Sequence, residues 1–263
     1  MNLYPYISCI FIAIICAILS VIIYEKNWLI LTGGIAHTAF GGIGVGIYAG
    51  FNPMIGAAGF SLASALLIAN KFKEKTEVTI SILWASGMAI GTIFYNLAEN
   101  PSAQITDYLF GDIMNISNGS MIFLIILSII VLALFYMYRD LLILYLSDRE
   151  YCSVRGINVK ILDNIILIIV AMAVVAMLKL VGIILIIALL AAPIAIAVKL
   201  SNDFTHRIFI SGLISLISSL LGVLIADKFL VNSGASIALV SCFIYLLSSF
   251  IPKKSNKHIH IKN

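Results

Sequence analysis

Charged residues are scarce in this sequence, and their scarcity excludes an ordinary soluble domain. Asp, Glu, Lys and Arg make up 11% of the 263 residues, while hydrophobic residues make up 62%. Soluble domains have about 25% charged and 45–50% apolar residues. The mean hydropathy is +1.13, and no polar block is long enough to form a domain of its own. We therefore predict a single all-α, polytopic membrane domain over residues 1–263.

The motifs of several enzyme classes are also missing. The chain has no GxxxxGK[ST] loop and no Gly-Lys pair, which excludes ATP binding by that route. HExxH and GxSxG are absent, and the four cysteines have no CxxC spacing that would indicate a metal or redox site. The basic residues cluster in short loops, which indicates orientation in a bilayer more than nucleic-acid binding. We therefore predict no enzymatic activity, no bound cofactor and no nucleic-acid partner.

Apolar runs long enough to cross a bilayer recur along the whole chain. A spanning helix needs about 20 residues, and on that basis the sequence predicts eight to nine spans. The nine candidates lie near residues 3–23, 33–50, 53–70, 78–98, 121–145, 161–178, 183–199, 208–226 and 233–251. Only Lys179 and Gly182 interrupt the run that holds the sixth and seventh spans, and we expect a tight hairpin there.

Lysine and arginine predict the orientation, because they concentrate in cytoplasmic loops. With the loop 148–160 placed inside, fourteen of the sixteen basic residues are cytoplasmic, and only Lys179 and Lys228 are outside. We therefore expect a protein of the cytoplasmic membrane with its N-terminus outside and its C-terminus inside. The short basic tail 252–263 then lies in the cytoplasm. Its histidines, His258 and His260, form an exposed pair that is a poor metal site.

The longest outer connection, residues 99–120, mixes aromatic residues with Asp107 and Asp112. These acids are candidates for an outer gate region of a transport pathway. The alternative is that they are solvated surface residues, as most carboxylates in loops are.

Residues 31–50 carry seven glycines in an apolar, helix-length run, although Gly costs a helix about 1 kcal/mol relative to Ala. Four of the glycines, together with Thr38, fall at successive i+4 positions, which predicts a ridge of small residues where another helix approaches closely. These glycines are Gly34, Gly42, Gly46 and Gly50. We expect a bulky substitution on this ridge, at Gly46, to cost more than one at Gly44.

His37 lies one residue off that ridge, aligned with Gly33, Gly41 and Gly44. This glycine-lined stripe predicts free space beside the imidazole. An ionisable group at that depth is a candidate functional residue. The alternative is a structural histidine, hydrogen-bonded between helices, and the sequence leaves both open.

The loop 148–160 is the one inner polar segment with helical character, and Gly156 is its expected helix stop. A short amphipathic helix there is suited to docking a soluble partner. An ordinary charged connector is the alternative.

Four stretches resemble the permease subunits of metal-ion ABC importers, the zinc, manganese and iron uptake class. In chain order they are GGIAHTAFGGIGVG, YLFGDIMNIS, DREYCSVRGI and LKLVGIILIIALLAAPIAIAV. The resemblance implies the membrane-spanning subunit of an importer for a divalent metal ion, driven by ATP hydrolysis on a separate subunit. It also implies a homodimer, two cytoplasmic ATP-binding subunits and an extracytoplasmic metal-binding protein.

The resemblance further implies roles for individual residues. It makes residues 148–157 the helix that couples to the ATPase, with Glu150 and Gly156 at the matching positions. Asp148 and Arg155 are further candidates for this coupling. The resemblance also makes His37 the histidine of the metal pathway.

The chain departs from the family's pattern at Gly33, where Asp is common. Asp and His at i and i+4 would face a metal together, whereas His37 alone offers a single ligand. The alternative function is a secondary transporter for a cation or small solute that works without a partner, in which the Gly-rich helix binds the substrate. Dependence on an ATPase distinguishes the two.

Overall fold

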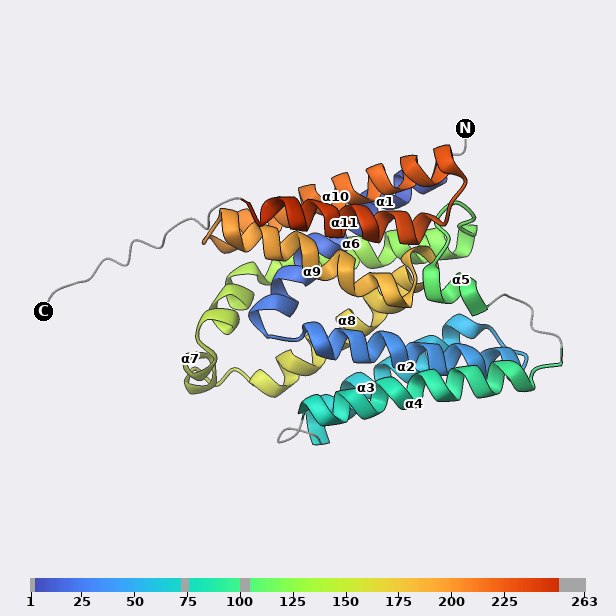
Figure 1. Cartoon of the computed structure of the whole chain (residues 1–263). Coiled ribbons are helices and arrows are strands. Elements are labelled where there is room, and N and C mark those ends of the chain that lie inside the picture. Colours follow the sequence, from blue (N-terminus) through green and yellow to red (C-terminus); the bar gives the residue numbers. More distant parts are fainter. Residues whose placement is uncertain (1–2, 72–75, 100–104, 251–263) are drawn as a thin grey trace, which may run out of the picture.

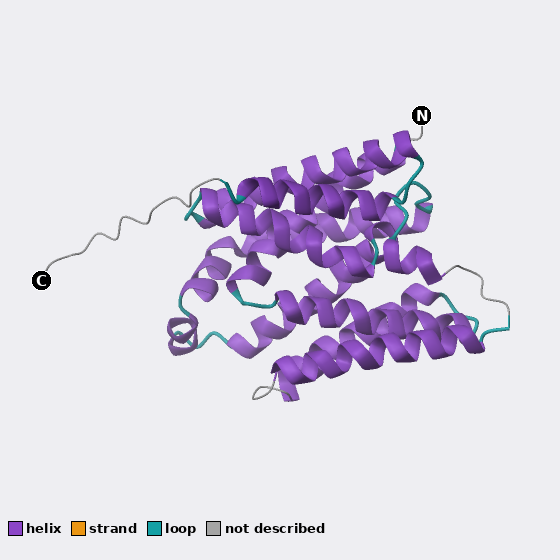
Figure 2. Ribbon diagram, viewed as in Figure 1, coloured by secondary structure: helices purple, strands orange, loops and turns teal. Residues whose placement is uncertain are grey.

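Helices account for every regular element in the described part of the chain (Figures 1 and 2). The computed structural model describes residues 3–71, 76–99 and 105–250. The helices are α1 (Tyr4–Glu25), α2 (Leu29–Tyr48), α3 (Pro53–Lys71), α4 (Thr76–Leu97), α5 (Ile105–Phe110), α6 (Asn118–Ser147), α7 (Arg149–Val154), α8 (Val159–Val181), α9 (Ile183–Leu200), α10 (Phe204–Phe229) and α11 (Ser233–Ser248). The predicted all-α class is confirmed.

Each predicted span coincides with one long helix, and the short helices α5 and α7 lie in connections. Within the described residues, six helices are long and apolar enough to cross a membrane, namely α1, α2, α4, α6, α8 and α10. Pro53–Ala69 of α3, Ile186–Leu200 of α9 and Ser233–Ser248 of α11 are shorter apolar segments. The count of nine spans is therefore not confirmed, although the helix positions agree.

Several helices begin at a polar side chain that accepts a backbone N–H of the first turn. Ser117, Asp148, Asn158, Asp203 and Asn232 cap α6, α7, α8, α10 and α11 in this way. Such a cap contributes about 1 kcal/mol to helix stability. These residues mark where the five helices begin.

A single residue, Gly182, separates α8 from α9 at the predicted break. Its φ of +89° suits glycine, and a Cβ there would lie 2.4 Å from the carbonyl carbon of Phe110. The carbonyl of Lys179 accepts the N–H of Asp112 at 3.0 Å. The break therefore packs against the connection that follows α5.

The helices form two groups with α8 between them (Figure 1). One group contains α1, α6, α9, α10 and α11, and the other contains α2, α3 and α4. Helix α8 contacts α3 and α2 on one side and α6 on the other. The start of α1, the short helix α5 and the turn between α10 and α11 lie at one end of the molecule, and α7 and the end of α11 lie at the other.

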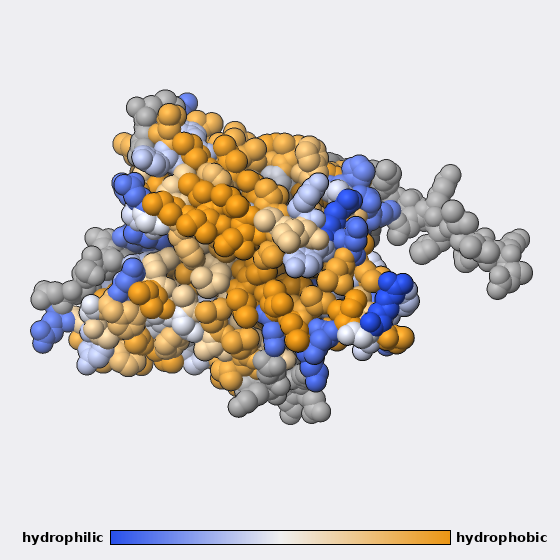
Figure 3. Space-filling model, turned by 180° about the vertical axis from the view of Figure 1, so that it is seen from behind, coloured by the Kyte–Doolittle hydropathy of each residue, from blue (hydrophilic) through white to orange (hydrophobic). Residues whose placement is uncertain are grey.

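One face of the molecule is apolar in the middle and polar toward its edges (Figure 3). Figure 3 shows a broad hydrophobic band across one face, with hydrophilic residues gathered at its edges. A bundle that crosses a bilayer needs this distribution, because water is absent from the hydrocarbon.

The predicted orientation can be tested at two exposed residues at opposite ends of the bundle. Val154 of α7 is 86% exposed and Leu230, after α10, is 91% exposed. In a background with the native cysteines replaced by alanine, we expect a membrane-impermeant maleimide to label Leu230→Cys in intact cells. Val154→Cys should react only after the membrane is opened. Labelling of both variants in intact cells would contradict the topology.

Candidate functional site

Helix α2 is the most enclosed of the helices around the candidate site. Residues 31–44 are all buried, and the helix packs chiefly against α3 and α4. Burial on all sides leaves little room for side chains. The glycines of α2 allow the neighbouring helices to approach its backbone closely.

Two pairs of glycines bring the backbone of α2 into direct contact with its neighbours. A Cβ on Gly42 would lie 2.0 Å from the carbonyl oxygen of Gly56 in α3. A Cβ on Gly44 would lie 2.2 Å from the carbonyl oxygen of Gly91 in α4. Both distances are far inside van der Waals contact, so neither position tolerates a side chain without a shift of backbone.

The two glycine faces of α2 therefore both pack against helices. On the predicted ridge, Gly46 lies against Pro53 of α3, 2.8 Å from the position of a Cβ, and Gly34 lies against Ile80 of α4 at the same distance. Gly50 takes no part, since no heavy atom lies within 4 Å of its Cβ position and its φ is +72°. It follows the end of α2 and terminates the helix.

The expected free space beside His37 is absent. A Cβ on Gly41 would lie 3.0 Å from the carbonyl oxygen of Gly87, so the backbone of α4 fills the stripe. For the same reason, the expectation that Gly46 is more sensitive than Gly44 is not supported, because Gly44 meets backbone at the shorter distance. The cause is the central position of α2, which has a neighbouring helix on each glycine face.

His37 is 6% exposed and stacks on Trp84 of α4, with ring centroids 4.2 Å apart and planes at 26°. Its Nδ1 has no hydrogen-bond partner in the described part of the chain. The hydrogen bond expected of a structural histidine is thus missing at this atom. The aromatic contact holds the ring, and Nδ1 remains an unused polar atom.

The position of the missing acid, Gly33, is filled from a different helix. A Cβ there would lie 2.8 Å from Cδ1 of Ile187 in α9 and 3.5 Å from the Trp84 ring. A carboxylate at this position would require Ile187 to move. Glycine at position 33 therefore leaves room for the end of the Ile187 side chain.

Metal-ligating side chains are sparse elsewhere in the described residues. No group of three or more His, Cys, Asp or Glu side chains lies close enough there to hold a metal ion. The tail histidines, His258 and His260, fall outside the described residues.

The loop 148–160 contains a short helix, α7. Asp148 begins it, with Oδ1 accepting the Tyr151 N–H at 2.8 Å, and Gly156 follows it with φ +80°. Glu150 is exposed, and the Arg155 guanidinium lies 4.7 Å from the Tyr151 ring centroid. The four residues predicted for coupling therefore lie in or beside one exposed helical turn.

The outer residues Asp107 and Asp112 have different surroundings. Asp107 is exposed on α5. Asp112 accepts the Met114 N–H at 2.9 Å and the Asn115 amide at 2.6 Å, which makes it a turn residue.

The chain on either side of Asp112 is tied to the start of α11. Asn232 donates to the Gly111 carbonyl at 2.8 Å, and the Ile113 N–H donates to Ser233 at 2.9 Å. With the bond from Asp112 to Lys179, these contacts join the α5 connection, the α8–α9 break and α11.

Sequence reasoning missed two residues of interest, Trp84 and Asp163. Nothing in the spacing of α4 singles out Trp84 as the partner of His37. Asp163 could have been identified from the sequence, because it is the single charged residue in the predicted span 161–178. It lies near the start of α8 and accepts hydrogen bonds from Tyr145 and Arg149.

Comparison with known proteins gives matches over nearly the whole chain. The ABC 3 transport family matches residues 4–252. An uncharacterized membrane protein of Synechocystis sp. is 32% identical over 246 residues, which are 92% of this chain and 87% of that protein. The manganese transport system membrane protein MntC of Listeria monocytogenes is 27% identical over 252 residues, 94% and 90% of the two chains. Among solved structures, PsaBC from Streptococcus pneumoniae in complex with Fab gives a TM-score of 0.85 at 25% identity, covering 95% of this chain and 91% of that one.

The close contact of α2 and α4 predicts different effects of one methyl group at two glycines. Gly44→Ala places the methyl against the Gly91 carbonyl, and overpacking of this kind costs about 1–3 kcal/mol. Gly59 of α3, with no heavy atom within 4 Å of its Cβ position, is the matched control. There the change should raise stability by up to about 1 kcal/mol through helix propensity. Thermal unfolding of the two purified variants in detergent measures the difference, and equal midpoints would refute the contact.

Proposed function

This chain belongs to the ABC 3 transport family, and we propose that it is the membrane-spanning subunit of an ABC importer that brings a divalent metal ion into the cytoplasm. ATP is hydrolysed on a separate cytoplasmic subunit. The family match over residues 4–252 carries the proposal. Two features of the chain support it: a buried histidine in the most enclosed helix and an exposed helical turn at one end of the bundle.

His37 is the proposed contact for the metal in the membrane. Ionisable side chains are costly in a bilayer and are found there mainly where they serve a function. The free Nδ1 of His37 supports this role, since a neutral imidazole nitrogen is a common metal ligand. Trp84 covers one face of the ring, so the ion approaches in the plane of the ring, where the nitrogen lone pair points.

The complex has two copies of this chain, two ATP-binding subunits and an extracytoplasmic metal-binding protein. Helix α7 is the docking site for the ATPase, through Asp148, Glu150, Arg155 and Gly156. The end with α5 and Asp107 faces the metal-binding protein. This arrangement places the N-terminus outside the cytoplasmic membrane and the C-terminus inside.

The cargo is manganese, zinc or iron, and two observations point in different directions. The Listeria relative is named for manganese transport, and carboxylates are the ligands that suit manganese. In this chain Gly33 offers no carboxylate, and an imidazole without one suits zinc or iron better. The metals therefore need to be compared in parallel.

Partner dependence is the direct test of the proposed function. In proteoliposomes with a metal-sensing dye inside, we expect the purified chain alone to move no manganese, zinc or iron. Addition of the ATPase subunit, the metal-binding protein and ATP should start uptake of one of the three. Uptake by the chain alone would instead indicate a secondary transporter.

The docking site can be examined in the same preparation. Glu150→Ala and Arg155→Ala should weaken capture of the ATPase subunit, because both side chains lie on or beside the exposed turn. Lys160→Ala, an exposed change at the start of α8, is the control and should leave capture unchanged. If Lys160→Ala weakens capture as much as the other two, docking is not specific to α7.

Replacement of His37 tests the metal contact. We expect His37→Ala to reduce uptake at least about tenfold, the effect of losing about 1.4 kcal/mol of interaction, without reducing assembly with the ATPase. His37→Asn should behave like alanine, because an amide hydrogen-bonds but binds these cations poorly. Uptake of the radioactive metal is the measurement.

The control for that experiment is His206→Ala. His206 is exposed and pairs with Asp203 at the start of α10, so its loss should leave uptake unchanged. Full transport by His37→Asn would assign His37 a structural role.

A further inference from the structure

Asp163 lies at the meeting point of four segments at the α7 end of the bundle. It belongs to the first turns of α8, and its side chain is 15% exposed. Lys26 comes from the connection between α1 and α2, Tyr145 from the end of α6, and Arg149 from α7. All three contact the carboxylate of Asp163.

The two oxygens of Asp163 serve different partners. Oδ1 lies 3.2 Å from the Lys26 ammonium and accepts the Tyr145 hydroxyl. Oδ2 accepts Arg149 at 2.5 Å. Lys26 also donates to Tyr145 at 2.8 Å, which closes the cluster. One carboxylate therefore joins the arginine of α7 to the lysine that precedes α2.

The contact of Asp163 with Lys26 is shielded from solvent, whereas its contact with Arg149 is partly exposed. The side chains of Lys26 and Asp163 are 11% and 15% exposed, whereas that of Arg149 is 52% exposed. Burial lowers the pKa of Lys26, and the negative charge of Asp163 opposes that shift. Breaking a buried pair leaves an uncompensated charge, a large destabilisation. The buried ion pair of Asp163 with Lys26 is therefore the stronger of the two. The pair with Arg149 is accessible to a docked partner.

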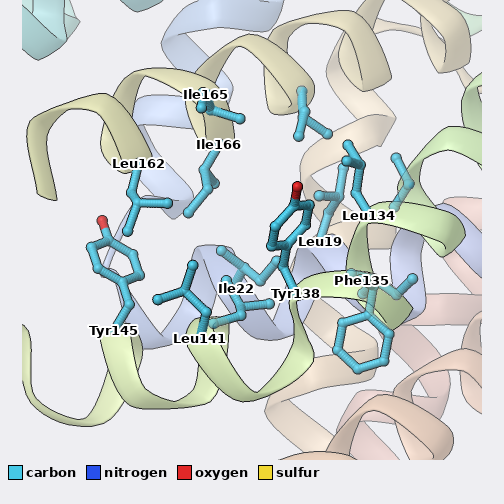
Figure 4. A pocket seen from close by; sticks show the side chains of 14 residues that line it. Leu19, Ile22, Leu134, Phe135, Tyr138, Leu141, Tyr145, Leu162, Ile165 and Ile166 are labelled. Carbon is cyan, nitrogen blue, oxygen red and sulfur yellow. The ribbon is translucent and has the colours of Figure 1, made fainter. Parts of the chain in front are cut away.

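A cavity beside the cluster reduces the packing of the second half of α6 against α1 and α8. It has a volume of about 380 Å³ and lies between α1, α6 and α8 (Figure 4). Tyr138 has non-helical φ and ψ and marks a kink in α6. Figure 4 shows Tyr138 and Leu141 on α6 and Ile166 on α8 around the cavity, and Tyr145 near its end beside Leu162. The polar contacts of Tyr145 therefore tether the end of α6 where apolar packing is reduced.

The connection from Lys26 to the candidate metal pathway is short. Only residues 26–28 separate α1 from α2, and Asn27 in the middle has a φ of +56°. A displacement of Lys26 therefore acts directly on the first turn of α2, the helix that carries His37.

We propose that the Asp163 carboxylate is the positioning group that couples α7 to the start of α2, so that movement imposed by the ATPase on α7 reaches the helix of His37. The inference rests on the function proposed above. Asp163 contacts neither the metal nor the ATPase in this scheme. It acts through Arg149 and Lys26.

The test is the ratio of metal transported to ATP hydrolysed in the reconstituted complex. Asp163→Asn keeps the shape of the side chain and removes its charge. We expect the complex to assemble and to hydrolyse ATP within about twofold of wild type, while the ratio falls about tenfold or more because a buried pair is broken. Asp163→Glu restores a carboxylate and should recover most of the ratio.

The Glu25–Arg207 ion pair is the matched control. It lies at the same end, with side chains 28% and 17% exposed, and joins the end of α1 to α10. Glu25→Gln should leave the ratio unchanged. Arg149→Gln alters the exposed arm and should lower the ratio without risk to the core, which keeps the test decisive if Asp163→Asn does not fold.

The outcomes separate the two proposals. Absence of metal transport by the wild-type complex would refute the proposed function. Wild-type transport combined with an unchanged ratio in Asp163→Asn and Arg149→Gln would overturn the coupling role. Equal losses of transport and hydrolysis in both variants would also overturn it, because a residue that only maintains the fold lowers both together.

Discussion

The direct backbone contact of α2 with α3 and α4 is the constraint on which the rest of the structure depends. At Gly42 and Gly44 there is no space for even a methyl group, because Gly56 and Gly91 meet them from opposite helices. Each glycine gives up about 1 kcal/mol of helix propensity, and packing of the close-lying backbones offsets that cost. The position of His37, against Trp84, follows from this crossing.

Much of the fold can be predicted from local properties of the sequence. Which helices pack against α2 cannot be predicted in this way. The length of the apolar runs predicted where the helices lie, and Gly182 predicted the break between α8 and α9, since hydrophobic length and a helix-breaking residue act locally. The glycines aligned with His37 are compatible with an open cavity or with a close-packed helix, so their sequence does not distinguish the two. The position of α4 in the folded chain determines that the space is filled. Likewise, only the folded chain shows that Ile187 of α9 lies against Gly33.

The cluster around Asp163 shows the other limit of sequence reasoning. A single acid in an apolar span signals a paired or functional group, but its partners come from residues 26, 145 and 149 in three segments. Helix α2 packs closely against α3 and α4 at Gly42 and Gly44, so in the proposed coupling a displacement at Lys26 would reach all three helices. In that proposal, the close helix crossing and the ionic contacts of Asp163 act together.

In the role proposed for His37, the scarcity of other ligands around it suits a site that must release the metal ion. A metal held by several ligands leaves slowly, whereas conduction needs binding that is favourable enough to admit the ion and weak enough to let it go. Ile187 fills the space where an acid at Gly33 would project, so each copy of the chain offers one imidazole on this part of α2. Two copies facing one another would offer two nitrogen ligands, fewer than the four of a closed structural zinc site. In the proposed function, a site with so few ligands favours passage of the ion over storage.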